Sequence, residues 1–226
     1  MTAPLRAPSP MNRRLLGLAL AATLASSCDF SQPPIGCPVQ SLEWAATYKR
    51  VGSSACPLKP GEQLGIQKFS TPERDERLSI NPETLVKLDE RDPGRLSYSL
   101  GTLAKESDAE GFCAATNLPV AEKHAPAIGT TPAADIVYRW SDVRILATAR
   151  APGTQMVASL EYTENGCTAT YEVWAMWPGD VSCEGENGQP DDRLCEEAGS
   201  INPDFAVTCD PTQLRCVPAK RPPSLQ

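Results

Sequence analysis

Cysteine is the residue type with the most chemical potential in this chain. The 226 residues include nine cysteines but one histidine, His124. Thiols form disulfides, bind metals or act as nucleophiles, and their spacing helps to distinguish these roles. No two cysteines have the Cys-x-x-Cys spacing common in zinc sites, and histidine ligands are scarce. The pattern therefore favours disulfides, and it predicts neither a metal nor another cofactor.

The amino-terminal region has the layout of an export signal. Two arginines, Arg13 and Arg14, precede an uncharged apolar run over residues 15–25. That run is shorter than the roughly 20 apolar residues needed to cross a bilayer. A basic start, a short apolar run and small residues are typical of a signal peptide. We expect residues 1–27 to form one, whether translation starts at Met1 or Met11.

The segment Leu24-Ala25-Ser26-Ser27-Cys28 resembles the lipobox of bacterial lipoproteins. The usual lipobox has leucine three places before its cysteine, where this chain has Ala25. The resemblance implies cleavage after Ser27 and attachment of acyl chains to Cys28. The alternative is an ordinary secretory signal cleaved near Ser27, with Cys28 in a disulfide.

Cysteine parity supports lipidation independently. An odd count in an exported chain leaves one cysteine without a partner. Assigning Cys28 to a lipid leaves an even set for disulfides: Cys37, Cys56, Cys113, Cys167, Cys183, Cys195, Cys209 and Cys216. Eight cysteines allow 105 connectivities. Our preferred set pairs Cys37 with Cys56, Cys113 with Cys167, Cys183 with Cys209, and Cys195 with Cys216.

The charge balance argues against nucleic acid as a partner. The whole chain has a formal net charge of -7, and loss of Arg6, Arg13 and Arg14 with the signal would leave -10. Binding to phosphate backbones requires clustered lysine and arginine. Membrane contact is instead expected through the lipid on Cys28.

Alternating apolar and polar residues predict strands over much of residues 40–180. Leu42, Trp44, Ala46 and Tyr48 alternate with mostly polar neighbours, and shorter alternations occur around Leu64 and across residues 96–100. Residues 136–147 change phase, which predicts a bulge near Ser141 and Asp142. These short strands favour a mainly β domain, an antiparallel sandwich or open barrel.

A hairpin is the most specific local prediction. Asn165 and Gly166 separate two strand-like runs, as in two-residue turns with positive φ. The implied register pairs Leu160 with Tyr171 on the core face. Trp174 falls on the opposite face, which makes it the candidate partner-facing residue.

Helix signals are few, and the carboxyl-terminal region differs in character. Residues 81–83 (Asn-Pro-Glu) and residues 107–110 each have the features of a short helix start. Residues 28–39 are expected to form a tether, residues 181–218 a cysteine-rich appendage, and residues 219–226 a disordered tail. Residues 208–218 resemble the closing half of small secreted cysteine-rich modules, which depend on disulfides for stability.

Other candidate groups for chemistry have simpler interpretations. His124 is expected in a solvated loop. Acidic clusters that might hold calcium, but lack the order of an EF-hand loop, are expected to be solvated. These clusters are residues 89–92, Glu184 with Glu186, and Asp191 with Asp192.

These observations favour a non-enzymatic lipoprotein of the bacterial cell envelope. It would be anchored to the outer membrane or to the periplasmic face of the inner membrane. The chain would act as a binding or scaffolding module for another envelope protein or a polysaccharide. The alternative is an exported hydrolase that uses two carboxylates on envelope glycans, but the sequence selects no such pair and no catalytic residue.

Overall fold

The computed structural model describes residues 36–226. The predicted signal peptide, Cys28 and most of the predicted tether lie outside these residues. Residues 35–226 group into one compact unit. The boundaries predicted at residues 40 and 181 therefore fall inside a single unit.

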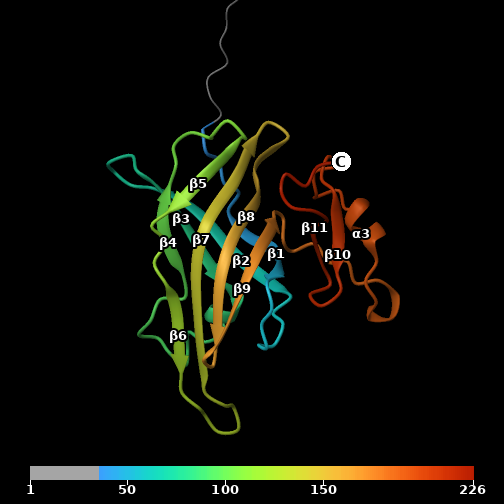
Figure 1. Ribbon diagram of the computed structural model, residues 1–226. Coiled ribbons are helices and arrows are strands. Elements are labelled where there is room, and N and C mark those ends of the chain that lie inside the picture. Colours follow the sequence, from blue (N-terminus) through green and yellow to red (C-terminus); the bar gives the residue numbers. More distant parts are fainter. Residues whose placement is uncertain (1–35) are drawn as a thin grey trace, which may run out of the picture. The chain divides into compact units, whose positions relative to one another are not determined.

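The main sheet has nine antiparallel strands in the order β5-β4-β3-β2-β1-β9-β8-β7-β6 (Figure 1). In addition β5 pairs with β7, which closes β1 to β5 and β7 to β9 into a ring. The mainly β, antiparallel class is confirmed, although the ring is closed where an open barrel or sandwich was expected. The strands are β1 (Leu42–Val51), β2 (Gly61–Ser70), β3 (Glu76–Pro82), β4 (Ser99–Leu103), β5 (Phe112–Thr116), β6 (Ala121–Ala125), β7 (Ala134–Thr148), β8 (Ala151–Glu164) and β9 (Cys167–Met176).

A bulge in β7 makes this closure possible. The register between β7 and β8 shifts between Ser141 and Arg144, where Asp142 adopts a φ of 50°. The first part of β7 pairs with β6, and the part after the bulge pairs with β5. The predicted bulge is confirmed. It allows β7 to pair with both β5 and β6 along the same edge.

The interior of the ring is filled by alternate side chains of its strands. Trp44, Tyr138 and Tyr171 are among the largest fully buried residues. Burial of such rings provides much of the favourable free energy of folding. Leu42 is an exception to the expected alternation, because it has a φ of 83° and is 67% exposed.

The alternation predicted for residues 96–100 has the wrong phase. Leu96 and Leu100 are exposed, whereas Ser97 and Ser99 are buried. The Ser99 hydroxyl donates a hydrogen bond of 2.7 Å to the carbonyl oxygen of Pro119. A satisfied hydroxyl can be buried at little cost, so hydrophobicity alone misassigned this face.

The predicted hairpin between β8 and β9 is confirmed. Leu160 lies opposite Tyr171, and Glu164 lies opposite Cys167. Asn165 and Gly166 have φ values of 50° and 80°. Positive φ at both central positions gives the turn a twist that matches the flanking strands.

The predicted helices are only partly correct. Helix α2 (Glu83–Val86) lies where the Asn-Pro-Glu pattern predicted a helix start, but its N-cap is Pro82 instead of Asn81, and no side chain caps it. Residues 107–110 form no helix, because the Asp108 side chain accepts hydrogen bonds from the backbone N–H groups of Glu110 and Phe112, both at 2.9 Å. Helix α3 (Asp192–Glu196), which the sequence analysis missed, is capped by Asp191.

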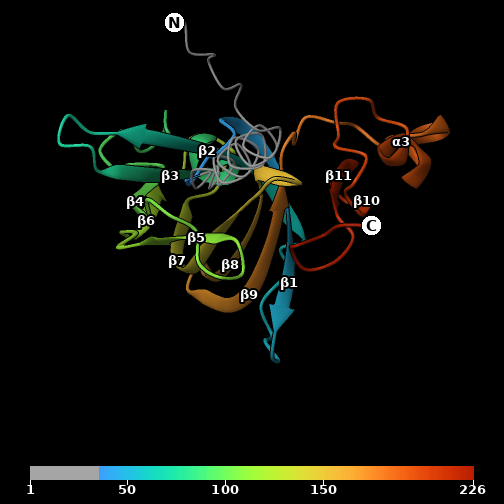
Figure 2. The same ribbon diagram turned by 90° about the horizontal axis from the view of Figure 1, so that it is seen from above.

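The cysteine-rich segment packs on the outside of the ring. It contains the short helix η1 (Glu186–Gly188), α3, and the hairpin of β10 (Val207–Asp210) and β11 (Arg215–Pro218). Phe205 and Ile201 join outward side chains of the ring, such as Val157 and Met176, in a second apolar cluster. Figure 2 shows the hairpin of β10 and β11 beside β1 and β9, with α3 on the far side of this hairpin.

The last residues of the chain are also packed, contrary to the disordered tail expected over residues 219–226. Ser224 is fully buried, and its backbone N–H donates to the side chain of Gln155 on β8 at 2.7 Å. The Gln155 side chain donates in turn to the carbonyl oxygen of Ser224 at 3.1 Å. A buried glutamine on the outer face of β8 therefore fixes the terminus.

The hairpin register gives a direct test by mutation. Leu160 is fully buried, whereas Glu161 is exposed and has a long ion pair of 3.8 Å with Arg139. We expect Leu160→Ala to lower the free energy of unfolding by about 2 to 5 kcal/mol and Glu161→Ala by less than about 1 kcal/mol. Denaturant titration measures both, and equal losses would contradict the register.

Candidate functional site

All eight cysteines of the described residues are paired in disulfides. The predicted pairs Cys183–Cys209 and Cys195–Cys216 are confirmed. The predicted pairs Cys37–Cys56 and Cys113–Cys167 are wrong, because Cys37 joins Cys113 and Cys56 joins Cys167.

The topology of β1 explains the error. Cys37 precedes β1 and Cys56 follows it, and a strand of 10 residues is about 33 Å long. Val51, at the end of β1, lies opposite Thr170 of β9. The chain after β1 therefore continues toward the start of β9, where Cys167 lies. Proximity in sequence favoured the wrong partner.

Disulfide mapping tests these pairs. Digestion of the unreduced protein, followed by mass spectrometry, should release peptides joined by Cys37–Cys113 and by Cys56–Cys167, with no free thiol among the eight. Reduction before digestion is the control, because it should abolish both joined peptides. Recovery of a Cys37–Cys56 peptide would contradict the fold around β1.

Trp174 lies on the outer face, as the hairpin register predicted, but that face is covered. Its side chain is half-buried and packs against the apolar cluster formed with the cysteine-rich segment. The Lys49 ammonium lies 5.3 Å from the centre of its ring, within the range of a cation–π interaction. Much of the surface expected to meet a partner protein is thus occupied by the chain itself.

His124 lies on strand β6, not in the solvated loop that we expected. Its Nδ1 atom is 2.7 Å from a carboxylate oxygen of Asp135, and its Nε2 atom is 3.5 Å from Glu122. The imidazole is exposed at the edge of the sheet. Both ring nitrogens thus have a carboxylate neighbour, an arrangement that joins β6 to β7.

The acidic residues 89–92 hold structure together rather than forming a solvated loop. Asp89 pairs at 2.7 Å with the ammonium of Lys123 on β6, which is fully buried. Asp92 accepts a hydrogen bond of 2.7 Å from the His124 backbone N–H, and this bond lowers the pKa of Asp92. A buried ammonium is costly unless its donors are satisfied. The loop before β4 therefore folds over Lys123.

In the cysteine-rich segment Asp191 and Asp192 have a similar role, whereas Glu184 and Glu186 are exposed, as predicted. Asp191 caps α3 and pairs with Arg193 at 2.8 Å. Asp192 accepts hydrogen bonds from the Thr208 hydroxyl at 2.9 Å and the Cys209 N–H at 2.6 Å. These carboxylate oxygens therefore stabilise the fold of the cysteine-rich segment. The sulfur atoms of Cys183, Cys195 and Cys216 lie within 4.8 Å of one another, but each belongs to a disulfide.

A polar network inside the ring was missed by the sequence analysis. The carboxylate of Glu62 accepts hydrogen bonds from the hydroxyls of Tyr48 and Tyr138, at 2.9 and 2.5 Å, and from the Thr84 N–H at 2.8 Å. Its remaining neighbour is the Lys59 ammonium at 3.2 Å. Glu62 is 5% exposed. Its alternation with Leu64 and Ile66 was the signal that it points inward.

The tyrosines of this network are held in the protonated form. Burial raises the pKa of both Tyr48 and Tyr138, and the negative charge of Glu62 raises each further. Burial, followed by the charge of Glu164, also raises the pKa of Tyr162. Because these pKa values are higher in the folded chain, the network contributes its full stability below the unfolded tyrosine pKa of about 10. That contribution decreases as the pH rises above it.

Substitution of Tyr138 tests the network. Tyr138→Phe removes a hydrogen bond to a charged group and should lower the free energy of unfolding near neutral pH by about 1.5 to 3 kcal/mol. Denaturant titrations between about pH 9 and 11 should show a shallower loss of stability than in the wild type, because one fewer shifted tyrosine titrates. Tyr98→Phe, outside the cluster, is the matched control. An unchanged slope in Tyr138→Phe would argue against the network.

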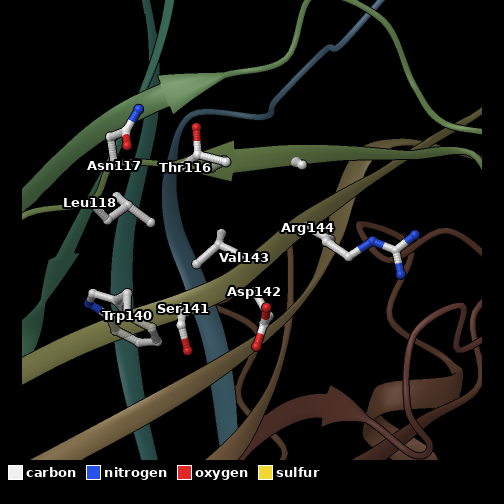
Figure 3. A pocket seen from close by; sticks show the side chains of 10 residues that line it. Thr116, Asn117, Leu118, Trp140, Ser141, Asp142, Val143 and Arg144 are labelled. Carbon is white, nitrogen blue, oxygen red and sulfur yellow. The ribbon is translucent and has the colours of Figure 1, made fainter.

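The bulge of β7 adjoins a hollow of about 420 Å³ (Figure 3). The figure shows Arg144 extending away from Trp140 and Leu118. Arg144 binds the carboxylates of Asp108 and Glu110 at 2.6 and 2.8 Å. Asp142 accepts a hydrogen bond of 3.3 Å from the Ser159 hydroxyl. The charged groups at this hollow thus have partners within the chain.

Two further hollows lie on the outer face of the strands β1 to β4. The larger has a volume of about 650 Å³ and lies beside Leu42 and Trp177. The other has a volume of about 420 Å³ and lies between Phe69 and Tyr98. Between them, the two hollows are lined by aromatic rings, side-chain amides and hydroxyls. No helix of the described residues is long and apolar enough to span a membrane.

The geometry defines a class: a closed antiparallel sheet whose apolar core encloses a polar network around Glu62, and an outer segment cross-linked by disulfides. Residues 42–178 match the sequence model of the MlpA family, and the chain belongs to this family. It is 34% identical over 240 positions to the "Putative lipoprotein MlpA" of Myxococcus xanthus, an alignment that covers 96% of this chain and all of that protein. The family and this relative support a lipoprotein. No solved structure matches the chain.

Proposed function

We propose that the chain is an exported lipoprotein, held to a bacterial membrane by acyl chains on Cys28, whose domain is a non-enzymatic binding or scaffolding module. Residues 1–27 act as the signal peptide, and residues 28–39 connect the lipid to the domain. The membrane is the outer membrane or the periplasmic face of the inner membrane. The partner is another envelope protein or a polysaccharide.

The pairing of the cysteines is the observation that carries the proposal. The chain has nine cysteines, and the eight within the described residues pair among themselves. This arrangement leaves Cys28 without a partner in its own chain. The same residue ends the lipobox-like segment 24–28. In the secretory alternative Cys28 forms a disulfide, and a disulfide within the chain would require one of these four bonds to be absent.

The anchor and the domain fit together physically. Each methylene that enters the bilayer contributes about 0.8 kcal/mol, so several acyl chains on one residue give stable attachment. Four disulfides stabilise the domain in an oxidising compartment outside the cytoplasm. Both features suit a protein that works at the surface of a membrane.

A binding role fits the described residues better than hydrolysis. The buried carboxylates of Glu62 and Asp92 both accept hydrogen bonds from groups of the same chain. A hydrolase instead needs one carboxyl group free to donate a proton and a second one near the scissile bond. The open hollows on the outer face offer contact area, which a binding module requires.

Replacement of Cys28 tests the anchor. Cys28→Ala should abolish incorporation of radiolabelled palmitate and move the protein from the membrane fraction to the aqueous fraction, because the acylated thiol is lost. Ser31→Ala, in the same predicted tether, is the matched control and should keep both properties. Palmitate incorporation that persists in Cys28→Ala would refute the lipid assignment.

A further inference from the structure

Four residues form a row across the outer face of neighbouring strands. Glu43 of β1 lies opposite Gly65 of β2, and Gly65 lies opposite Asn81 of β3. Ile80 pairs with Ser99, so Asn81 comes opposite Tyr98. The three steps between strands span roughly 14 Å. Because Gly65 has no side chain, the protein surface is recessed at the middle of this row.

This row connects the two hollows of the outer face into one groove. Gly65, Glu43 and Trp177 line the larger hollow. Asn81 and Tyr98 line the smaller one. Gly65 and Asn81 are cross-strand neighbours, so the two hollows lie next to each other on the outer face of β2 and β3. We call the surface from Trp177 across Gly65 to Tyr98 the outer groove.

The outer groove contains an unsatisfied hydrogen-bond acceptor. The side-chain oxygen of Asn81 is buried and has no hydrogen-bond partner within the described residues. Buried polar atoms are normally paired with protein or water, so this oxygen is one acceptor beside the groove that no group of the described residues occupies. At the other end, Leu42 is exposed with a φ of 83°, which a bulky residue rarely adopts. Strain of this kind is often found at functional sites.

We propose that the outer groove binds a neutral polysaccharide, which rests on the proposed binding function and names its ligand class. Trp177 and Tyr98 lie at opposite ends and supply apolar ring surfaces for the C–H faces of sugar rings. Asn81 and Gln67 supply amides between them, and Glu43 and Asp180 supply acceptors for pairs of hydroxyls. An aromatic platform beside hydrogen-bonding groups matches a sugar, which has an apolar face and a polar rim.

Other ligand classes fit the groove less well. Glu43 and Asp180 repel anionic polymers, as does the net negative charge of the chain. An extended peptide binds a sheet best by pairing with a free strand edge. Here β2 already pairs with β1 and β3, and β3 already pairs with β2 and β4. The backbone of the groove therefore has no free edge to offer a peptide.

Gly65 makes this proposal testable without damage to the fold. Its backbone does not adopt positive φ, and an added Cβ would lie 3.4 Å from the Cβ of Asn81. That distance is an ordinary contact, so the strand itself does not require glycine. A larger side chain would instead point outward from β2 and fill the middle of the groove.

The experiment is calorimetric titration of the full-length lipoprotein in detergent with three neutral hexasaccharides: cellohexaose, chitohexaose and maltohexaose. The wild type should bind at least one of them saturably. Gly65→Leu should weaken that binding by at least about tenfold and keep the thermal midpoint of the wild type. Thr170→Leu, which adds the same side chain to the outer face of β9, is the matched control and should bind normally.

Asn81→Ala separates a ligand-binding role from a structural one. The asparagine oxygen has no partner among residues 36–226, so its removal should leave the thermal midpoint unchanged or raise it, while the affinity decreases. Loss of stability without loss of affinity would assign Asn81 a structural role and overturn its place in the groove.

Three outcomes would overturn the proposal. They are no saturable binding of any hexasaccharide, equal binding by Gly65→Leu and wild type, and binding of a neutral heptapeptide in place of the sugars. Each is distinguishable from failure of the proposed function, because membrane attachment is measured separately by Cys28→Ala. A protein that is anchored but inert toward sugars would refute only the ligand class.

Discussion

The rest of the structure depends on the switch of β7 between two neighbours. At the bulge between Ser141 and Arg144, the strand changes register against β8. Its two halves can then pair with β6 and with β5. Without this switch β5 would pair with β4 alone, and the sheet would keep two open edges. Unpaired edges are sites of aggregation, and an open sheet would expose Glu62 to water.

Closure of the ring determines where polar groups can be buried. Glu62 and Lys123 point inward from β2 and β6, and each is surrounded by partners from other parts of the chain. Such networks stabilise a fold only when every member is satisfied. They therefore fix the positions of the loops that supply those partners. The outer face differs, since the cysteine-rich segment covers the side of β1 and β9, while no other part of residues 36–226 packs as a layer on the side of β2 to β4.

The sequence predicted those features that depend on neighbouring residues. The hairpin at Asn165–Gly166, the bulge at Ser141–Asp142 and the position of α2 follow from local turn chemistry and side-chain period, and all three are confirmed. The errors at Cys37, Ser99 and Asp108 share a cause. Cys37 and Ser99 bond to residues far along the chain, and Asp108 accepts hydrogen bonds from the backbone of a turn. Neither kind of partner can be recognised from the alternation of apolar and polar residues. The cover over Trp174 was missed because a segment without periodicity gives no sign of where it packs.

The disulfide Cys37–Cys113 links the entry point of the chain to β5. Residues before Cys37 lead toward the predicted anchor, so tension from the membrane first meets this covalent bond. The load then passes into the strand that closes the ring, and β1 is protected from being peeled away from β2 and β9. Shear between a membrane and a bound partner would act on the sheet as a whole. If the proposed anchor and partner are both engaged, the domain would transmit force between them as one body.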